Sequence, residues 1–140
     1  MYISGLLTIF SLNFGDMQSL KTKKSYKDLG YWLRKKKFTC IEFQDKSEYI
    51  STYWLNQPVT FKLKEEVGFE TWYKEAFGGS LIVFEIAYEE GNVKIRGYCP
   101  LLLFGFWSMK LSFKKKAGFL FKYRKEGYNI QEELLEFLSK

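Results

Sequence analysis

The sequence predicts an α+β domain: a mostly antiparallel, twisted sheet of about seven strands packed against two or three short helices. Residues 81–124 show strand periodicity in four consecutive segments joined by short connections, which favours antiparallel pairing. The chain has 140 residues, of which 46% are hydrophobic and 20% aromatic. That length and composition predict one domain, residues 1–140, with a substantial core.

The clearest strand pattern lies in residues 107–113, where Trp, Met, Leu and Phe alternate with Ser and Lys. Alternation resumes in residues 119–124, so we expect a hairpin with residues 114–118 as its loop. In that register Phe113 lies opposite Phe119, a cross-strand aromatic pair. The same register gathers basic side chains on the other face of the hairpin: Lys110, Lys122 and Arg124.

A second hairpin is expected just upstream. Residues 81–88 are apolar on both faces except for Glu85, which predicts a strand covered on both sides. Residues 89–92 contain Gly and Asn and supply the turn. The returning strand then places Lys94 and Arg96 on the face of Glu85, and we interpret Glu85 as one half of a cross-strand ion pair.

The two hairpins are connected by a segment around Pro100. Proline cannot donate a backbone hydrogen bond, so a strand break or a sheet edge is expected there. The uncharged run Gly97–Met109 is too short to cross a bilayer, and a buried strand is the favoured interpretation. The alternative is an exposed apolar edge used for dimerisation or membrane contact.

The N-terminal segment Met1–Gly15 is apolar-rich and fits a helix or a buried strand equally well. It lacks the features of a signal peptide, so we expect it in the core, with a membrane-surface helix as the alternative. Cys40 and Cys99 have no paired spacing and are predicted to be buried free thiols. A cytoplasmic location is the expectation that follows.

The first helix is predicted from Ser25, because Ser25 and Asp28 have the spacing of a capping box. Leu29, Trp32 and Leu33 form its apolar face. The basic run Lys35–Lys37 then falls in the last turn, where cations suit the helix dipole. This structural role explains the run without any partner.

Three strands are expected next, in residues 38–43, 49–55 and 59–63. Residues 69–77 carry apolar side chains at helical spacing before Gly78-Gly79, which predicts a short amphipathic helix. A C-terminal helix is predicted from Asn129, with Glu132 at its third position. An aromatic helix that leads into a strand with one Glu occurs twice, which suggests a diverged repeat.

The chain contains no histidine, which excludes Ser-His-Asp and Cys-His nucleophile systems and histidine-based zinc sites. No phosphate-binding or dinucleotide-binding glycine motif is present. Glu42 and Glu85 could act as a carboxylate pair only if they faced one cleft. We therefore expect a protein that is not an enzyme and has no metal site or cofactor.

Charge is segregated along the chain: residues 93–125 contain nine basic residues and no acidic one. Basic side chains interleaved with aromatics on strands are typical of single-stranded nucleic-acid platforms. The first hypothesis is a binding module for an anionic partner: nucleic acid, anionic lipid or an acidic protein surface. Its candidate residues are Lys94, Arg96, Lys110, Lys114, Lys115, Lys116, Lys122 and Arg124. The simpler alternative is that these residues form the solvated face of an amphipathic sheet.

Two other classes remain open at this point. A curved sheet on a helix can enclose an aromatic-lined cavity for a hydrophobic ligand. The candidate wall residues are Phe104, Phe106, Trp107, Phe121 and Tyr123. The third hypothesis is a partner or inhibitor of one specific protein, antitoxin-like, that pairs oppositely charged patches.

Overall fold

The computed structural model describes residues 17–41, 47–54, 57–64, 68–76, 80–103, 107–113 and 121–140. These residues form eight strands and two helices, and every strand pairing is antiparallel, so the α+β prediction is confirmed. The helices are α2 (Tyr26–Lys35) and α3 (Phe121–Ser139). The strands are β1 (Gln18–Lys21), β2 (Thr39–Ile41), β3 (Ser47–Trp54), β4 (Gln57–Lys64), β5 (Glu70–Glu75), β6 (Leu81–Glu89), β7 (Asn92–Leu103) and β8 (Trp107–Ser112).

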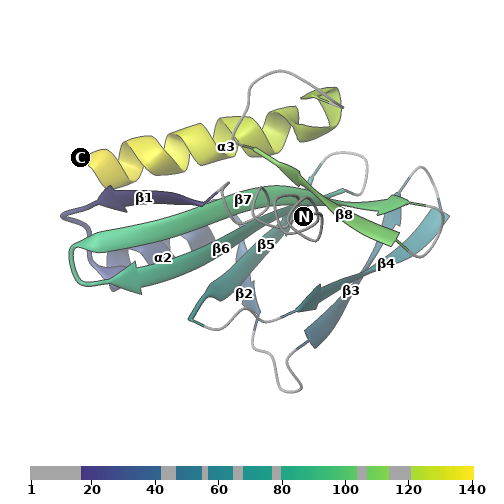
Figure 1. The fold of residues 1–140 in the computed structure, drawn as a ribbon, viewed down its shortest axis with the longest axis horizontal. Helices are drawn as coiled ribbons and strands as arrows, with labels where there is room; N and C mark the ends of the chain where they lie inside the picture. Colours follow the sequence, from purple (N-terminus) through teal and green to yellow (C-terminus); the bar gives the residue numbers. More distant parts are fainter. Residues whose placement is uncertain are drawn as a thin grey trace, which may run out of the picture.

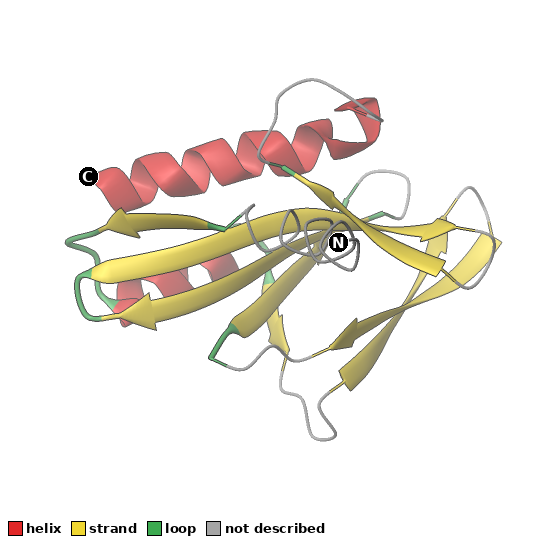
Figure 2. Cartoon of the chain, in the orientation of Figure 1, coloured by secondary structure: helices red, strands yellow, loops and turns green. Residues whose placement is uncertain are grey.

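Six of these strands form the main sheet: five follow the order β1-β7-β6-β5-β2, and the sixth, β8, also pairs with β7 (Figure 1). The long strand β7 pairs with β1 through its first residues and with β8 through its last ones. Strands β3 and β4 form a separate hairpin that is distinct from the main sheet (Figure 2).

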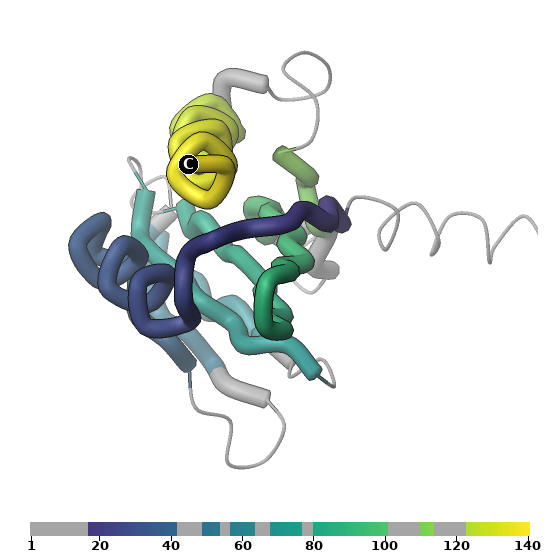
Figure 3. Tube along the Cα trace, turned by 90° about the vertical axis from the view of Figure 1, so that its left-hand side faces the viewer, coloured from purple at the N-terminus to yellow at the C-terminus, as the bar shows by residue number. Residues whose placement is uncertain are grey.

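The two faces of the main sheet are covered differently. Helices α2 and α3 lie on one side of it, which we call the helix face (Figure 3). There Trp72 and Phe84 pack with helix residues such as Leu33 and Leu134 in the larger core. The β3–β4 hairpin covers part of the opposite side, the hairpin face, in a second apolar cluster. Its buried members are Ile41, Ile50, Phe61, Leu63, Leu81, Val83 and Tyr98.

Helix α2 begins with the predicted capping box. The backbone N–H of Asp28 donates to the Ser25 hydroxyl at 3.1 Å, and the Ser25 N–H donates to the Asp28 carboxylate at 3.2 Å. The helix ends with Lys37 in the left-handed region, at φ 74°, and with the Phe38 N–H bonded to the Leu33 carbonyl. This is a Schellman ending with lysine at the position that usually holds glycine.

The predicted turn between β6 and β7 is present, with Gly91 at φ 81° and Glu89 paired with Asn92. The prediction of a strand break at Pro100 was wrong, because β7 continues to Leu103. The sheet-edge alternative fits better. The pairing of β7 with β6 ends at Tyr98, so among the described strands Pro100 pairs with β8 alone.

The helix predicted over residues 69–77 is instead strand β5, which lies between β6 and β2. Both Thr71 and Trp72 are buried, on opposite faces of the sheet. A strand covered on both faces loses strict alternation, so its apolar residues matched a helical spacing by coincidence. The proposed repeat fails with it, because Trp72 is not on a helix.

The strand predicted over residues 119–124 was also wrong, since residues from Phe121 onward belong to α3. Asn129 therefore lies inside this helix and does not cap it. Arg124, Gly127, Gln131 and Leu134 are buried at helical spacing, so the stripe that faces the sheet begins before Asn129. Phe121 and Tyr123 lie on this helix, so the predicted second strand of the 107–124 hairpin is absent there.

Several expectations concern residues outside the described ones, including the N-terminal segment 1–15 and the loop 114–118. Within the described ranges, neither helix is long and apolar enough to cross a membrane. Cys40 and Cys99 are both free thiols, as predicted; Cys99 is buried, whereas Cys40 is only partly buried.

Candidate anion-binding surface

The structure places some of the predicted basic side chains in solvent and buries others in the protein. Lys94 and Lys110 are exposed on the hairpin face of the sheet, and the Lys110 ammonium lies 4.8 Å from the ring centre of Tyr98. Arg96 shares this face by register but is only 3% exposed. Its Nε donates to Oε1 of Glu85 at 2.6 Å, which confirms the predicted ion pair and assigns it to the interior.

Arg124 also points inward, from α3 on the opposite side of the sheet. Its Nη1 donates to the carbonyl oxygen of Ser112 at 2.6 Å. The prediction that Arg124 and Lys122 share the face of Lys110 was therefore wrong, because both residues belong to α3. The side chains of Lys122 and of Lys114–Lys116 lie outside the described residues.

The predicted cavity wall is represented by a single described side chain, Tyr123. This side chain is partly buried against the larger core, and its hydroxyl donates to the Pro100 carbonyl oxygen at 3.2 Å. Burial raises the pKa of Tyr123 above its ordinary value. Tyr123 thus packs as a core residue. The side chains of the other candidates, Phe104, Phe106, Trp107 and Phe121, are not among those described.

Among the described side chains, a dense group of positive charges lies on and around α2. Residues 17–41 contain eight basic residues and one acidic residue, Asp28, while the whole chain has a formal net charge of +6. Asp28 is engaged in the capping box. We call five exposed cations of α2 and its flanks, with the exposed ring of Tyr31 between them, the α2 basic surface: Lys23, Lys27, Tyr31, Arg34, Lys35 and Lys37. Lys21 is exposed as well but belongs to strand β1.

The helix period explains why these residues face outward. Leu29, Gly30 and Leu33 form the buried stripe of α2. Lys27, Tyr31 and Lys35 follow each other at four-residue steps on the opposite side, so they form one ridge. Tyr31 is 70% exposed, an unusual position for a large aromatic side chain.

Two other lysines of the region serve the contact between the helices. Trp32 of α2 and Phe137 of α3 stack with their ring centres 5.6 Å apart. The Lys24 ammonium lies 4.9 Å from the Phe137 ring centre, and the Lys36 ammonium lies 5.5 Å from that of Trp32. Lys36 also pairs with Glu133 at 3.3 Å. These contacts hold α2 beside α3 and leave the α2 basic surface facing solvent.

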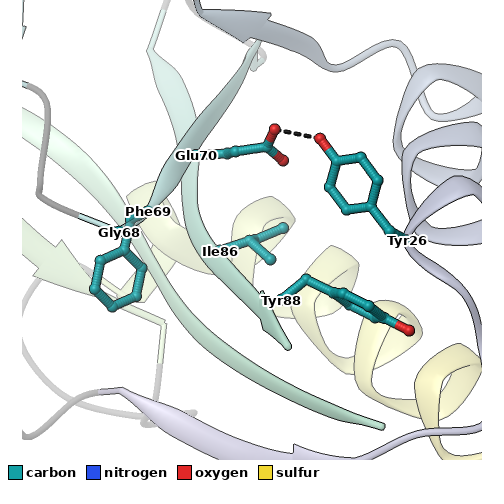
Figure 4. A pocket seen from close by; sticks show the side chains of 6 residues that line it. All are labelled: Tyr26, Gly68, Phe69, Glu70, Ile86 and Tyr88. Atoms are coloured by element: carbon teal, nitrogen blue, oxygen red, sulfur yellow. Dashed lines mark hydrogen bonds between the residues drawn. The ribbon is translucent and has the colours of Figure 1, made fainter. Parts of the chain in front are cut away.

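A pocket of about 310 Å³ adjoins the N-terminal end of α2. Figure 4 shows the Glu70 carboxylate directed toward the Tyr26 hydroxyl, with Ile86 and Tyr88 beside them. The Phe69 ring is turned away from this group in the same view. The pocket therefore combines aromatic rings, one aliphatic side chain and a carboxylate.

The hydrogen bonds of the pocket fix both tyrosines. The Tyr26 hydroxyl donates to Glu70, and the Tyr88 hydroxyl donates to the carbonyl oxygen of Lys24 at 2.7 Å. The two rings are 5.9 Å apart and inclined at 59°. The bond to Glu70, with partial burial and the carboxylate charge, raises the pKa of Tyr26 to about 12. Tyr26 thus remains a donor at neutral pH.

Sequence reasoning identified the basic run of α2 but gave it a structural role, and it missed the pocket. Tyr26, Glu70 and Tyr88 come from three elements, and no sequence motif connects them. Among the described residues no group of three or more Cys, Asp or Glu side chains is placed to hold a metal ion. Comparison of the chain with protein-family models, with curated proteins and with solved structures finds no match.

Proposed function

We propose that this chain is a non-enzymatic binding module whose anionic partner is a single-stranded nucleic acid, contacted through the α2 basic surface. The observation that carries the proposal is the ridge of Lys27, Tyr31 and Lys35, where an exposed aromatic ring stands between two cations. Lysines suit phosphates, and an exposed aromatic ring offers a stacking platform for an unpaired base.

The sheet proposed from sequence is a weaker candidate for this surface. Its two arginines are buried and bonded within the protein, so Lys94 and Lys110 remain as its exposed, described cations. The α2 basic surface has five exposed cations over a short segment. Counterion release makes affinity depend on the number of phosphates contacted at once, which favours the denser group.

The test is a fluorescence anisotropy titration with a labelled single-stranded oligonucleotide at low and moderate salt. The variant K23Q/K27Q/K35Q removes three charges from the α2 basic surface. We expect about tenfold weaker binding at low salt and a log–log salt slope shallower by about 2.

The matched control is K62Q/K94Q/K110Q, which removes the same charge from exposed lysines of the strands. This control should bind nearly as well as the natural chain. Equal losses in both variants would show attraction by net charge alone, and no binding at low salt would reject the proposal. Binding to anionic lipid vesicles but not to the oligonucleotide would reject nucleic acid as the partner.

A further inference from the structure

The pocket beside α2 lies at the N-terminal end of that helix, because Tyr26, the first residue of the helix, is one of its lining side chains. Lys23 and Lys27 flank Tyr26 in the chain, and the backbone of Lys24 accepts the hydrogen bond from Tyr88. A strand held by Lys23 and Lys27 would bind at the same end of α2 as the pocket. The volume of about 310 Å³ is at the lower end for small-ligand sites, on the order of 300 Å³, and suits one ring-sized group.

The polar chemistry of the pocket selects for hydrogen-bond donors. Among the described residues, Tyr26 donates a hydrogen bond to Glu70. A carboxylate has about four acceptor positions, so Glu70 retains capacity for a ligand. The Tyr88 hydroxyl is engaged with the Lys24 carbonyl, so this residue offers its ring to a ligand.

Charge narrows the choice of ligand further. A simple cation would suit Glu70 but would meet the repulsion of the neighbouring lysines, and a free phosphate would be repelled by Glu70. A nucleotide whose base carries an amino group suits both the lysines and Glu70, since its phosphate is anionic and its base presents N–H donors. Glutamate accepts from the cytosine amino group in known modes of base recognition.

Building on the proposed function, we propose that this pocket receives one unpaired, amino-bearing base of the bound strand, with the amino group donating to Glu70. The base packs against the rings of Tyr26 and Tyr88, while the phosphates stay on the α2 basic surface. Thymine and uracil lack the amino group, and their one ring N–H donor lies between two carbonyl oxygens that the carboxylate repels. The pocket therefore favours cytosine over thymine.

The experiment compares labelled oligo-dC and oligo-dT of equal length, near neutral pH and at one salt concentration. We expect the natural chain to bind oligo-dC about tenfold more tightly, the size expected for a hydrogen bond to a charged group. Glu70→Gln should remove this preference and leave oligo-dT affinity unchanged or improved, because the glutamine amide can donate to a thymine carbonyl. The glutamine also keeps an acceptor for Tyr26, so the fold is preserved.

Glu75→Gln is the matched control, since Glu75 is an exposed carboxylate on the same strand, β5. It should keep the full preference for oligo-dC. Equal affinity for both oligonucleotides, with K23Q/K27Q/K35Q still weakened, would overturn the pocket assignment and leave the proposed function standing. If the natural chain binds neither oligonucleotide, the proposed function itself fails. Loss of the preference in Glu75→Gln as well would reduce the effect to general charge and also overturn the assignment.

Discussion

A single substitution in the buried pair of Glu85 and Arg96 should destabilise the fold strongly. The two residues lie opposite each other on β6 and β7 and are 1% and 3% exposed. Both Nε and Nη2 of Arg96 lie 2.6 Å from the same carboxylate oxygen. The Phe69 ring lies on the guanidinium at 5.9 Å, and Thr71 lies beside Glu85 on the neighbouring strand. The pair therefore has very little contact with water.

Glu85→Gln leaves the Arg96 charge buried without an opposing charge. Breaking one side of a buried ion pair costs about 3–5 kcal/mol, and the amide keeps an acceptor, so we expect about 3 kcal/mol. Domains of this kind are stable by roughly 5–15 kcal/mol in total. With a urea dependence of about 2 kcal/mol per molar, the midpoint of unfolding should fall by about 1.5 M.

The double variant Glu85→Leu/Arg96→Met provides the decisive comparison. Replacing a buried pair by apolar residues of similar volume is often neutral or stabilising. The double variant should therefore be more stable than Glu85→Gln by about 2 kcal/mol or more, measured by urea unfolding followed by tryptophan fluorescence. A loss below about 1 kcal/mol in Glu85→Gln would refute the reasoning, because it would mean that water reaches the pair.

Two further predictions concern packing and the buried thiol. A Gly→Ala substitution in a helix normally stabilises it by about 1 kcal/mol. In Gly127→Ala, however, the new Cβ would overlap the Phe113 ring, so thermal unfolding should show a net loss of stability of about 1–2 kcal/mol. A gain in stability would contradict this packing. Burial raises the pKa of Cys99 to about 12, so a thiol reagent at pH 8 should label Cys40 and spare Cys99 until unfolding. The raised pKa of Cys99 also makes the free energy of unfolding depend on pH. The contribution of the protonated Cys99 thiol to stability is complete below the usual thiol pKa of about 8.5, and it is lost as the pH rises toward 12. In Cys99→Ala the free energy of unfolding should therefore fall less between about pH 8.5 and 12. An unchanged fall would mean that other groups cause it.

The sequence predicted best those features that short-range chemistry decides. The capping box of Ser25 and Asp28 satisfies backbone donors within one turn, and the Gly91 turn depends on the conformational freedom of one residue. The pairing of Glu85 with Arg96 follows from the length of that turn. Such features can be predicted from sequence because each depends on residues that are close together in the chain.

The errors in the predicted fold arose where tertiary packing overrides the local pattern. In β5, Trp72 contacts the helix-face core while Thr71 is buried on the other face, so the pattern of a half-exposed strand is absent. The C-terminal helix was predicted to begin at Asn129, yet α3 begins at Phe121 and includes Gly127, which lets the helix approach Phe113. The role of Gly127 depends on Phe113, the residue after β8, and the sequence around Gly127 gives no sign of that contact.

Tertiary packing also decides which of the basic residues are available for binding. Arg96 lies where both faces of the sheet are covered, so its charge must be paired inside the protein. A helix at the surface of a layered fold always keeps an outer stripe, and Lys27 and Lys35 occupy it. Charge segregation along a sequence therefore indicates a binding surface only where the element that carries it has a face left uncovered. In this chain that condition is met by α2, whose first residue also opens the pocket of Glu70 and Tyr88.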